Sequence, residues 1–408
     1  MATSTLIATS LTEMNSVSQA SLREIVCEET VAVCASLAGM EAIILTGSMA
    51  RDEASVIDDN GAIVVRGDAE FLLVFAKNVP VPSAQAIEQQ ATLVKSRLIE
   101  RNIQCKICLS PVSTAFLEGI VPHIFGYELR RCGRVAWGNR NALALVPAFE
   151  ATEIPLDDAV RLLCNRIIEL LEEVAASGPL SNQAQYATVK LCLDMATSFL
   201  VFTQDYRPTY RDRLLEIKNL AKATPVDAPF SLPRFAPFVE YSTQVKLSCG
   251  PSPSAFTKDS ETSERFLREA IQFADLLLRW ELQQLLKLDA AISGEDLLAH
   301  WAASQPWTSR LRGWTRVFRD AATTTTLRNW TRWLGLARHT SPRQSVYSAA
   351  CQLFFRLPNL LEDGQNDSLQ DLNSLLPICI EASEKVEWRP LAALIGRNYH
   401  QFLEFTRT

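Results

Sequence analysis

The sequence predicts an α+β N-terminal domain, with a mixed sheet flanked by helices, followed by one or more mainly α-helical C-terminal domains. Two observations support this order. Apolar runs of strand length, such as residues 42–45 and 71–75, lie within the first 150 residues. From Pro155 onward they give way to apolar residues at helical spacing. The 408 residues suffice for two or three domains.

The N-terminal elements are predicted from the chain in order. Residues 1–18 are rich in Ser and Thr and are expected to form a flexible leader before a helix over 19–38. The α+β domain is expected to span 19–150. Its further elements are a buried strand at 42–45, another at 71–75, a helix over 83–101, a strand at 103–109 and a last strand at 133–138.

Three helical or connecting segments are predicted after this domain. Residues 151–220 are expected to form a helical domain that abuts a cleft, with amphipathic helices over 156–176 and 182–202. Residues 221–262 are rich in Pro and Ser and are expected to be an irregular connection. Residues 263–408 are expected to be helical, beginning with a helix over 263–288 and continuing with two or three more.

Composition excludes several classes of protein. The formal net charge of −6 argues against a protein that coats nucleic acid. No apolar run approaches the roughly 20 residues that cross a bilayer, and the N-terminus lacks the features of a signal peptide. Cys105 and Cys108 lie in a predicted strand, where their side chains point to opposite faces, so zinc is not expected. We therefore expect a cytoplasmic protein without membrane contact.

The most informative feature is a turn that follows the first buried strand. The apolar residues 42–45 lead into Gly47 and Ser48, which break the strand. Ser48 is expected to cap a short helix that starts near Met49. Because the first backbone N–H groups of a helix lack partners, they favour phosphate oxygens. The sequence therefore predicts a phosphate-binding turn.

Two carboxylates precede the next buried strand. Asp68 and Glu70 lie at or just before the start of the run 71–75. Residues two apart on a strand point to the same side, with roughly 6–7 Å between their Cα atoms. This spacing lets both carboxylates converge on one magnesium ion, which prefers oxygen ligands and substrate phosphates.

Together these motifs resemble the nucleotidyltransferase superfamily, which includes DNA polymerase beta and the kanamycin nucleotidyltransferases. The family pattern is a Gly-Ser turn, often GSxARGEAS, followed by a D-x-D or D-x-E strand. This chain has GSMARDEAS, with Asp52 where Gly is commoner, and then DAEF. The resemblance covers about 100 to 150 N-terminal residues. It implies that Asp68 and Glu70 bind Mg²⁺ or Mn²⁺ as catalytic residues and that Gly47, Ser48 and Arg51 bind a nucleoside triphosphate.

The spacing between the two motifs is longer than in minimal family members. Ser48 and Asp68 are twenty positions apart. Residues 58–61 contain an Asn-Gly pair, which favours a tight hairpin, and residues 62–65 suit its returning strand. Asp58 and Asp59 are interpreted as turn residues rather than ligands.

A third carboxylate, usual in family members that transfer nucleotides, is missing from the expected strand. Residues 103–109 contain no acid, and Lys106 occupies roughly the expected position. A lysine stabilises phosphate charge but does not bind magnesium. The acids nearest in sequence are Glu118 and Glu128, and Glu128 reaches the site only if its segment folds back across it.

One residue of the predicted helical domain is a further candidate. Tyr186, Lys190 and Asp194 follow one another at a spacing of four on the second helix. Lys190 is expected either to contact the triphosphate across the cleft or to form a surface ion pair with Asp194.

The segment 307–343 is rich in Arg and Trp. It contains eight arginines against one acid, Asp320, with four tryptophans interleaved. Such a composition suits a polyanion surface. Trp314, Phe318, Trp330 and Leu334 are equally compatible with a buried helical stripe, and a protein partner for the arginines is a third interpretation.

Two functions follow from the sequence. The first is a magnesium-dependent transfer of a nucleoside monophosphate from a nucleoside triphosphate to an unidentified acceptor. The second is a catalytically degenerate module that binds nucleotide or serves in interaction or regulation, which the missing third acid favours.

Overall fold

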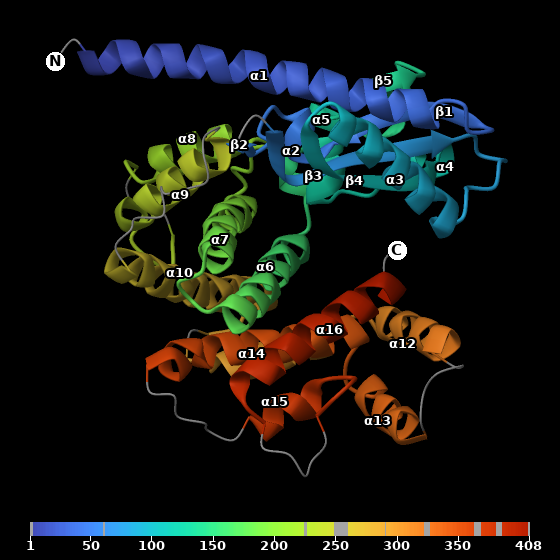
Figure 1. Ribbon diagram of the computed structural model, residues 1–408. Helices are drawn as coiled ribbons and strands as arrows, with labels where there is room; N and C mark the ends of the chain where they lie inside the picture. Colours follow the sequence, from blue (N-terminus) through green and yellow to red (C-terminus); the bar gives the residue numbers. More distant parts are fainter. Residues whose placement is uncertain are drawn as a thin grey trace. The chain divides into compact units, whose positions relative to one another are not determined.

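A five-stranded mixed sheet organises the N-terminal part of the chain. In the computed structural model, residues 3–59, 62–223, 227–248, 260–289, 291–321, 327–362, 369–380 and 386–406 are described. Strand β4 pairs with β3 in parallel, whereas the order β2-β3-β1-β5 is antiparallel throughout (Figure 1). The strands are β1 (Met40–Thr46), β2 (Val56–Asp59), β3 (Ala62–Phe75), β4 (Ile103–Ser113) and β5 (Arg134–Gly138).

Two helices cover one face of this sheet. Helix α1 (Thr3–Cys34) and helix α3 (Ala84–Glu100) share a core with alternate residues of β3, including Ala69, Phe71 and Leu73. The Ser83 hydroxyl caps α3 by accepting the Ala86 N–H at 3.3 Å. Because strand side chains alternate, Asp68 and Glu70 belong to the opposite face.

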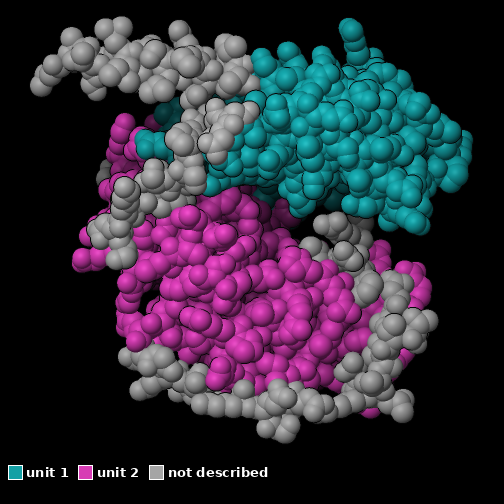
Figure 2. Space-filling view, in the orientation of Figure 1, with its two compact units in different colours: residues 1–155, 204–216, 243–255 teal, residues 156–203, 217–242, 256–408 magenta. Residues whose placement is uncertain are grey.

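The chain forms two compact units, which are described separately (Figure 2). Unit 1 comprises residues 1–155, 204–216 and 243–255, and unit 2 comprises residues 156–203, 217–242 and 256–408. Unit 1 also contains helices α2 (Gly47–Ala50), α4 (Thr114–Glu118) and α5 (Ile124–Cys132), and short 3₁₀ turns at Ala142–Leu145 and Ala151–Glu153.

The described part of unit 2 is helical. Its helices α6 and α7 pack against each other and against α10, α14 and α16. Residues 156–203 thus share one unit with the C-terminal helices instead of forming a domain of their own. The helices are α6 (Leu156–Ser177), α7 (Asn182–Phe202), α10 (Ser260–Leu286), α11 (Gly294–Ser304), α12 (Trp307–Ala321), α13 (Leu327–Ala337), α14 (Pro342–Glu362), α15 (Gln370–Leu375) and α16 (Trp388–Thr406).

Two further helices, α8 (Tyr210–Leu220) and α9 (Leu232–Leu247), each contribute residues to both units. Helix α9 lies where an irregular connection was expected, so that prediction is wrong for 232–247. Its prolines explain the error: Pro233 stands in the first turn, where proline is tolerated, whereas Pro237 lies inside the helix, where proline is uncommon. The side chains of Phe235 and Val239, on the apolar side of this helix, are buried.

The mixed α+β class with many helices is confirmed, but two details of the prediction are wrong. Helix α1 begins at Thr3 rather than near residue 19, and residues 3–38 contain neither Pro nor Gly to break it. Beyond α10, six helices rather than two or three lie among the described residues. None of the helices in the described ranges combines the length and apolar character that a membrane span requires.

Candidate functional site

The Gly-Ser segment and the acidic pair lie side by side because β1 and β2 share one edge of β3. Strand β4 occupies the other edge, pairing with β3 at residues from 63 to 75. On the shared edge, Thr46 of β1 is opposite Glu70, and the Arg66 N–H donates to the Ser55 carbonyl at 2.8 Å. The segment 47–54, which connects β1 to β2, therefore departs from this edge of β3 next to Asp68.

The long spacing between the motifs is explained by a β-hairpin, as predicted. Val56 pairs with Val65 and Asp59 with Ala62, so β2 and the first half of β3 form its two strands. Asp59 is consequently a strand residue and not a turn residue. Residues 60 and 61 and the Asp58 side chain lie outside what the structure describes.

Glycine at position 47 is required by both conformation and space. Its φ of +69° lies in the left-handed region. A Cβ atom there would stand 2.8 Å from Oε2 of Glu70, which is too close for a non-bonded contact. The backbone of the turn thus lies directly against one of the two carboxylates.

Ser48 does not cap the short helix, contrary to the prediction. Helix α2 already begins at Gly47, so Ser48 lies inside it, and the N-cap Thr46 makes no side-chain cap hydrogen bond. The reason is that β1 continues to Thr46 and the left-handed Gly47 starts the helix at once. Ser48 remains half-buried beside the turn.

Asp68 and Glu70 lie in the middle of β3 rather than at the start of a strand. A bulge precedes them, since Val64 pairs with Gln104 but Asp68 pairs with Lys106. Three residues of β3 thus face a single residue of β4, and such bulges re-aim the side chains beside them. Burial and the charge of Asp68 raise the pKa of Glu70, whose side chain still reaches solvent.

The strand register places Lys106 directly beside Asp68, as expected from the sequence. The Lys106 Nζ atom lies 3.0 Å from Oδ2 of Asp68, and the Cys108 thiol lies 3.3 Å from the same oxygen. The hydrogen bond to Asp68 raises the pKa of Lys106, so this side chain is charged at neutral pH. The position expected for a third carboxylate therefore carries a cation.

Arg51 is buried and paired with carboxylates. One guanidinium nitrogen lies 2.6 Å from Oε2 of Glu128 on α5, and Nε lies 3.3 Å from Oε2 of Glu53. The Arg51 side chain is only 6% exposed. In this arrangement it positions the Gly-Ser segment against α5, and the predicted phosphate contact stays a prediction.

The sequence left open whether the segment of Glu128 folds back toward the acidic pair. In the structure it does. The Oε1 atom of Glu128 accepts hydrogen bonds from Tyr206, at 2.6 Å, and from Arg213. Burial would raise its pKa, but the charges of Arg51 and Arg213 and the two hydrogen bonds outweigh burial and lower it. Because both oxygens are occupied, Glu128 neutralises two arginines rather than completing a metal site.

The segment 204–216, for which the sequence indicated no functional role, completes this cluster. Arg213 is buried and also donates to the carbonyls of Arg207 and Pro208. The fully buried Glu53 accepts the N–H groups of Tyr210 and Arg211 at 3.1 and 3.2 Å. A carboxylate at these positions stabilises the start of helix α8.

Asp52 occupies the position where Gly is commoner in the family pattern, and its φ is +58°. Asp is among the few non-glycine residues that adopt this conformation readily. Its carboxylate pairs with Arg23 of α1 and with Arg134 of β5, the latter at 2.9 Å. Asp52 thus suits the conformation of the turn and forms two ion pairs.

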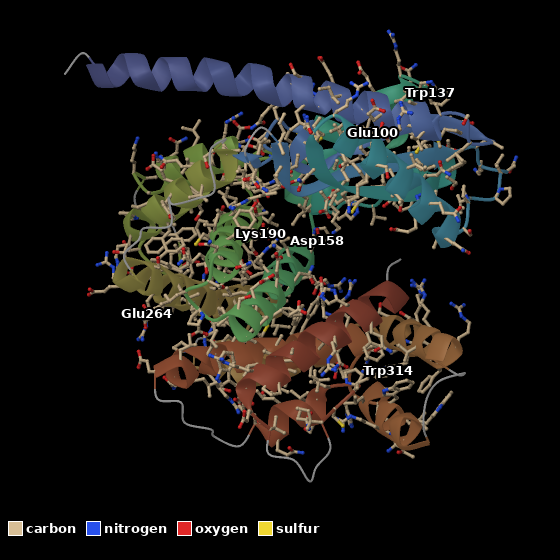
Figure 3. The ribbon with its side chains drawn as sticks, viewed as in Figure 1. Glu100, Trp137, Asp158, Lys190, Glu264 and Trp314 are labelled. Carbon is tan, nitrogen blue, oxygen red and sulfur yellow. The ribbon has the colours of Figure 1, made fainter. Side chains whose placement is uncertain are left out.

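Lys190 belongs to unit 2 and does not pair with Asp194, so that predicted pair is wrong. Figure 3 labels Lys190 on α7. This lysine pairs with Glu169 of α6 and lies over the Tyr186 ring, 5.5 Å from its centroid. Asp194 is buried and bonds Arg166 at 2.7 Å. The contact of α6 with α7 supplies both partners, which spacing along one helix does not reveal.

Part of the Arg/Trp-rich segment 307–343 belongs to a hydrophobic core. Trp314 and Trp333 are about 1% exposed, and their indole N–H groups donate to the carbonyls of Thr340 and Pro377. Leu334, which the alternative placed in the buried stripe, is 55% exposed. Val317 is buried with the two tryptophans instead, and Phe402 of α16 completes this cluster. Helices α12 and α13 therefore pack on α16 through tryptophans.

The site thus combines a glycine turn, two carboxylates and one lysine. In the described ranges, no three His, Cys, Asp or Glu side chains are grouped to hold a metal ion. Comparisons of the chain with protein-family models, with curated proteins and with solved structures found no match.

Proposed function

We propose that unit 1 is a nucleotidyltransferase-type domain that binds a nucleoside triphosphate and transfers its monophosphate to an acceptor. The observation that supports this most is the pairing of Thr46 with Glu70, which brings the Gly47 turn against the acidic pair. The resemblance of both motifs to the family supplies the chemistry.

Each residue has a role in this proposal. Asp68 and Glu70, on one strand face, supply the oxygen ligands that Mg²⁺ or Mn²⁺ prefers. The bound metal neutralises phosphate charge. The turn at Gly47 and Ser48 is the segment that contacts the phosphate oxygens in this proposal, and Lys106 adds positive charge next to Asp68. An acceptor oxygen forms a bond to the α-phosphorus, while the bond to the leaving pyrophosphate breaks.

A second candidate is a degenerate module that binds nucleotide without transferring it. The Lys106–Asp68 ion pair favours this function, because it places a cation where the third carboxylate of active members is expected. Glu128 does not substitute for that acid, since arginines and a tyrosine occupy its oxygens.

One experiment separates the two functions. The full chain is incubated with Mg²⁺ and each labelled nucleoside triphosphate in cell extract, and binding and pyrophosphate release are measured together. Release that disappears in Asp68→Asn and persists in Glu88→Gln, an exposed control on α3, supports transfer. Binding that is lost in Asp68→Asn and is not accompanied by release supports the degenerate module. The absence of any binding contradicts both functions.

A further inference from the structure

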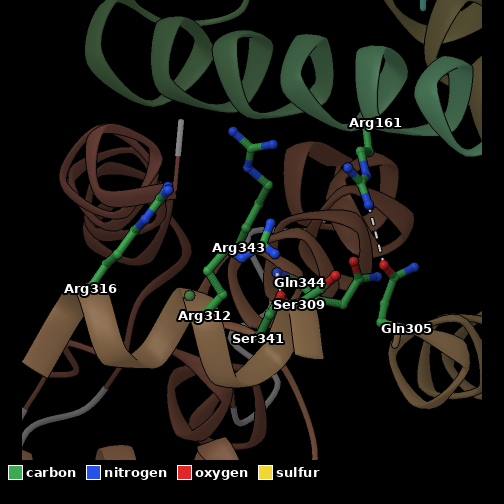
Figure 4. A pocket seen from close by; sticks show the side chains of 9 residues that line it. Arg161, Gln305, Ser309, Arg312, Arg316, Ser341, Arg343 and Gln344 are labelled. Carbon is green, nitrogen blue, oxygen red and sulfur yellow. Dashed lines mark hydrogen bonds between the residues drawn. The ribbon is translucent and has the colours of Figure 1, made fainter. Parts of the chain in front are cut away.

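Unit 2 contains a small polar cavity that neither proposed function uses. Its volume is about 150 Å³, and it opens among α6, α12 and the start of α14 (Figure 4). The lining residues are Arg161, Gln305, Ser309, Arg312, Gly313, Arg316, Ser341, Arg343 and Gln344.

The cavity is strongly cationic. Four arginines from three helices line it, and none of its described lining residues is acidic. Arg161 is offset by Asp157, one turn earlier on α6, at 2.7 Å, and bonds Gln305. Gathering like charges around one space is unfavourable unless nearby carboxylates or a bound anion offset them. Guanidinium groups suit phosphate especially, because their planar N–H pairs match its oxygens.

A buried amide also points to a missing acceptor. Gln344 is 3% exposed, and its Nε2 atom has no hydrogen-bond partner among the described residues. The Nε atom of the neighbouring Arg343 is also buried and has no hydrogen-bond partner among the described residues. A buried donor without an acceptor is costly, so natural proteins rarely keep one without a reason. Gln344 also lines the cavity, so an oxyanion there lies next to this amide, whose Nε2 atom is covered as the structure stands.

The start of helix α14 adds to this field. Ser341 caps the helix by accepting the Gln344 N–H at 3.2 Å, and Pro342 occupies its first position. The partial positive charge of a helix N-terminus makes Arg343 unfavourable there for the helix alone. The same charge attracts an anion. Helix start, arginines and buried amide therefore act on one space.

We propose that this cavity binds the phosphate or diphosphate group of a small phosphorylated ligand. The volume of about 150 Å³ is below the roughly 300–1,000 Å³ of pockets that enclose whole drug-sized ligands. It therefore suits the phosphate end, with any organic part outside. The proposal concerns unit 2 alone and does not depend on nucleotide binding in unit 1.

Calorimetric titration of the full chain with phosphate, pyrophosphate and a nucleoside diphosphate tests the proposal. Pyrophosphate is expected to bind one to one. Arg312→Gln and Arg343→Gln are expected to weaken it roughly tenfold or more, because each removes a charge-assisted hydrogen bond. Arg338→Gln, an exposed arginine outside the lining, is the matched control and is expected to change nothing. An affinity that is unchanged in Asp68→Asn shows that the acidic pair of unit 1 does not contribute to the measured binding.

Gln344→Leu is a second test variant, for the case that the arginine variants fail to fold. It removes the unpaired amide, so the melting temperature is expected to be kept while pyrophosphate binding weakens. Tighter binding of the nucleoside diphosphate than of free pyrophosphate identifies a phosphorylated metabolite, and the reverse order identifies the free anion. No binding of any probe, or equal affinity in the arginine variants, overturns the proposal. The proposal is also overturned if an oligonucleotide binds through Arg312 and Arg343 and pyrophosphate does not compete with it.

Discussion

The substitution Glu128→Gln tests whether Glu128 is the neutralising centre of unit 1. Glutamine keeps the shape of the side chain but leaves Arg51 and Arg213 without the carboxylate between them. Both arginine side chains are at most 6% exposed. Breaking a buried ion pair on one side costs about 3–5 kcal/mol, mainly because the remaining charge stays buried. We expect a loss of about 3 kcal/mol or more, because two cations are uncovered.

Urea denaturation at pH 7 measures this loss. The matched control is Glu118→Gln, whose carboxylate is half exposed and pairs with exposed Lys77 at 3.7 Å. Exposed pairs contribute about 0–1 kcal/mol, so the control is expected to be nearly as stable as the natural chain. Adding Arg213→Met to Glu128→Gln is expected to recover part of the loss, since it removes one uncovered cation.

The pH dependence provides an independent check on Glu128. Its folded pKa is lowered from 4.5, so its stabilising contribution is complete above that pH and is lost as the pH falls through the folded value. The Gln variant is therefore expected to show less acid destabilisation than the natural chain. If Glu128→Gln lowers the free energy of unfolding at pH 7 by less than about 1 kcal/mol, as the control does, Glu128 is not the carboxylate that neutralises the two buried arginines.

Three other substitutions have clear expectations. Gly47→Ala forces a Cβ against Glu70 at a left-handed φ, so urea denaturation is expected to show a loss of about 1–2 kcal/mol or more; an unchanged midpoint contradicts this. Asp52→Val is expected to be less stable than Asp52→Asn, because β-branched residues tolerate a φ of +58° poorly; equal stability contradicts that reason. Burial raises the pKa of Glu281 on α10 to about 8, so the folded state keeps a proton that the unfolded chain loses above about 4.5. The natural chain therefore loses stability as pH rises between these values, and the advantage of Glu281→Gln is expected to grow by about 3 kcal/mol from pH 4.5 to 7; a constant difference contradicts the shift.

Local patterns in the sequence predicted much of unit 1. The hairpin at residues 56–65 follows from its Asn-Gly pair, and the helix over 182–202 in unit 2 has the predicted bounds. The sequence also placed Lys106 roughly where the family has its third carboxylate, and Lys106 does pair with Asp68. The hairpin and the helix depend on residues close in sequence.

The remaining features depend on contacts between distant segments. Nothing in the local pattern of 204–216 shows that Arg213 pairs with Glu128, which lies 85 positions earlier. Likewise, Lys190 and Asp194 suit each other along α7, but the packing of α6 supplies Glu169 and Arg166 instead. Tertiary packing overrides spacing in both cases, and only the assembled fold shows which charge each side chain meets.

Calorimetric titration with a nucleoside triphosphate and Mg²⁺ tests the central claim most directly. The natural chain and Glu88→Gln are expected to bind, because neither alters the acidic pair of β3. Asp68→Asn and Glu70→Gln are expected to lose at least tenfold in affinity, since each removes a metal ligand. Binding that depends on Mg²⁺ and on both carboxylates is the predicted result. Absence of binding with every triphosphate, or equal binding in all four chains, would contradict the account.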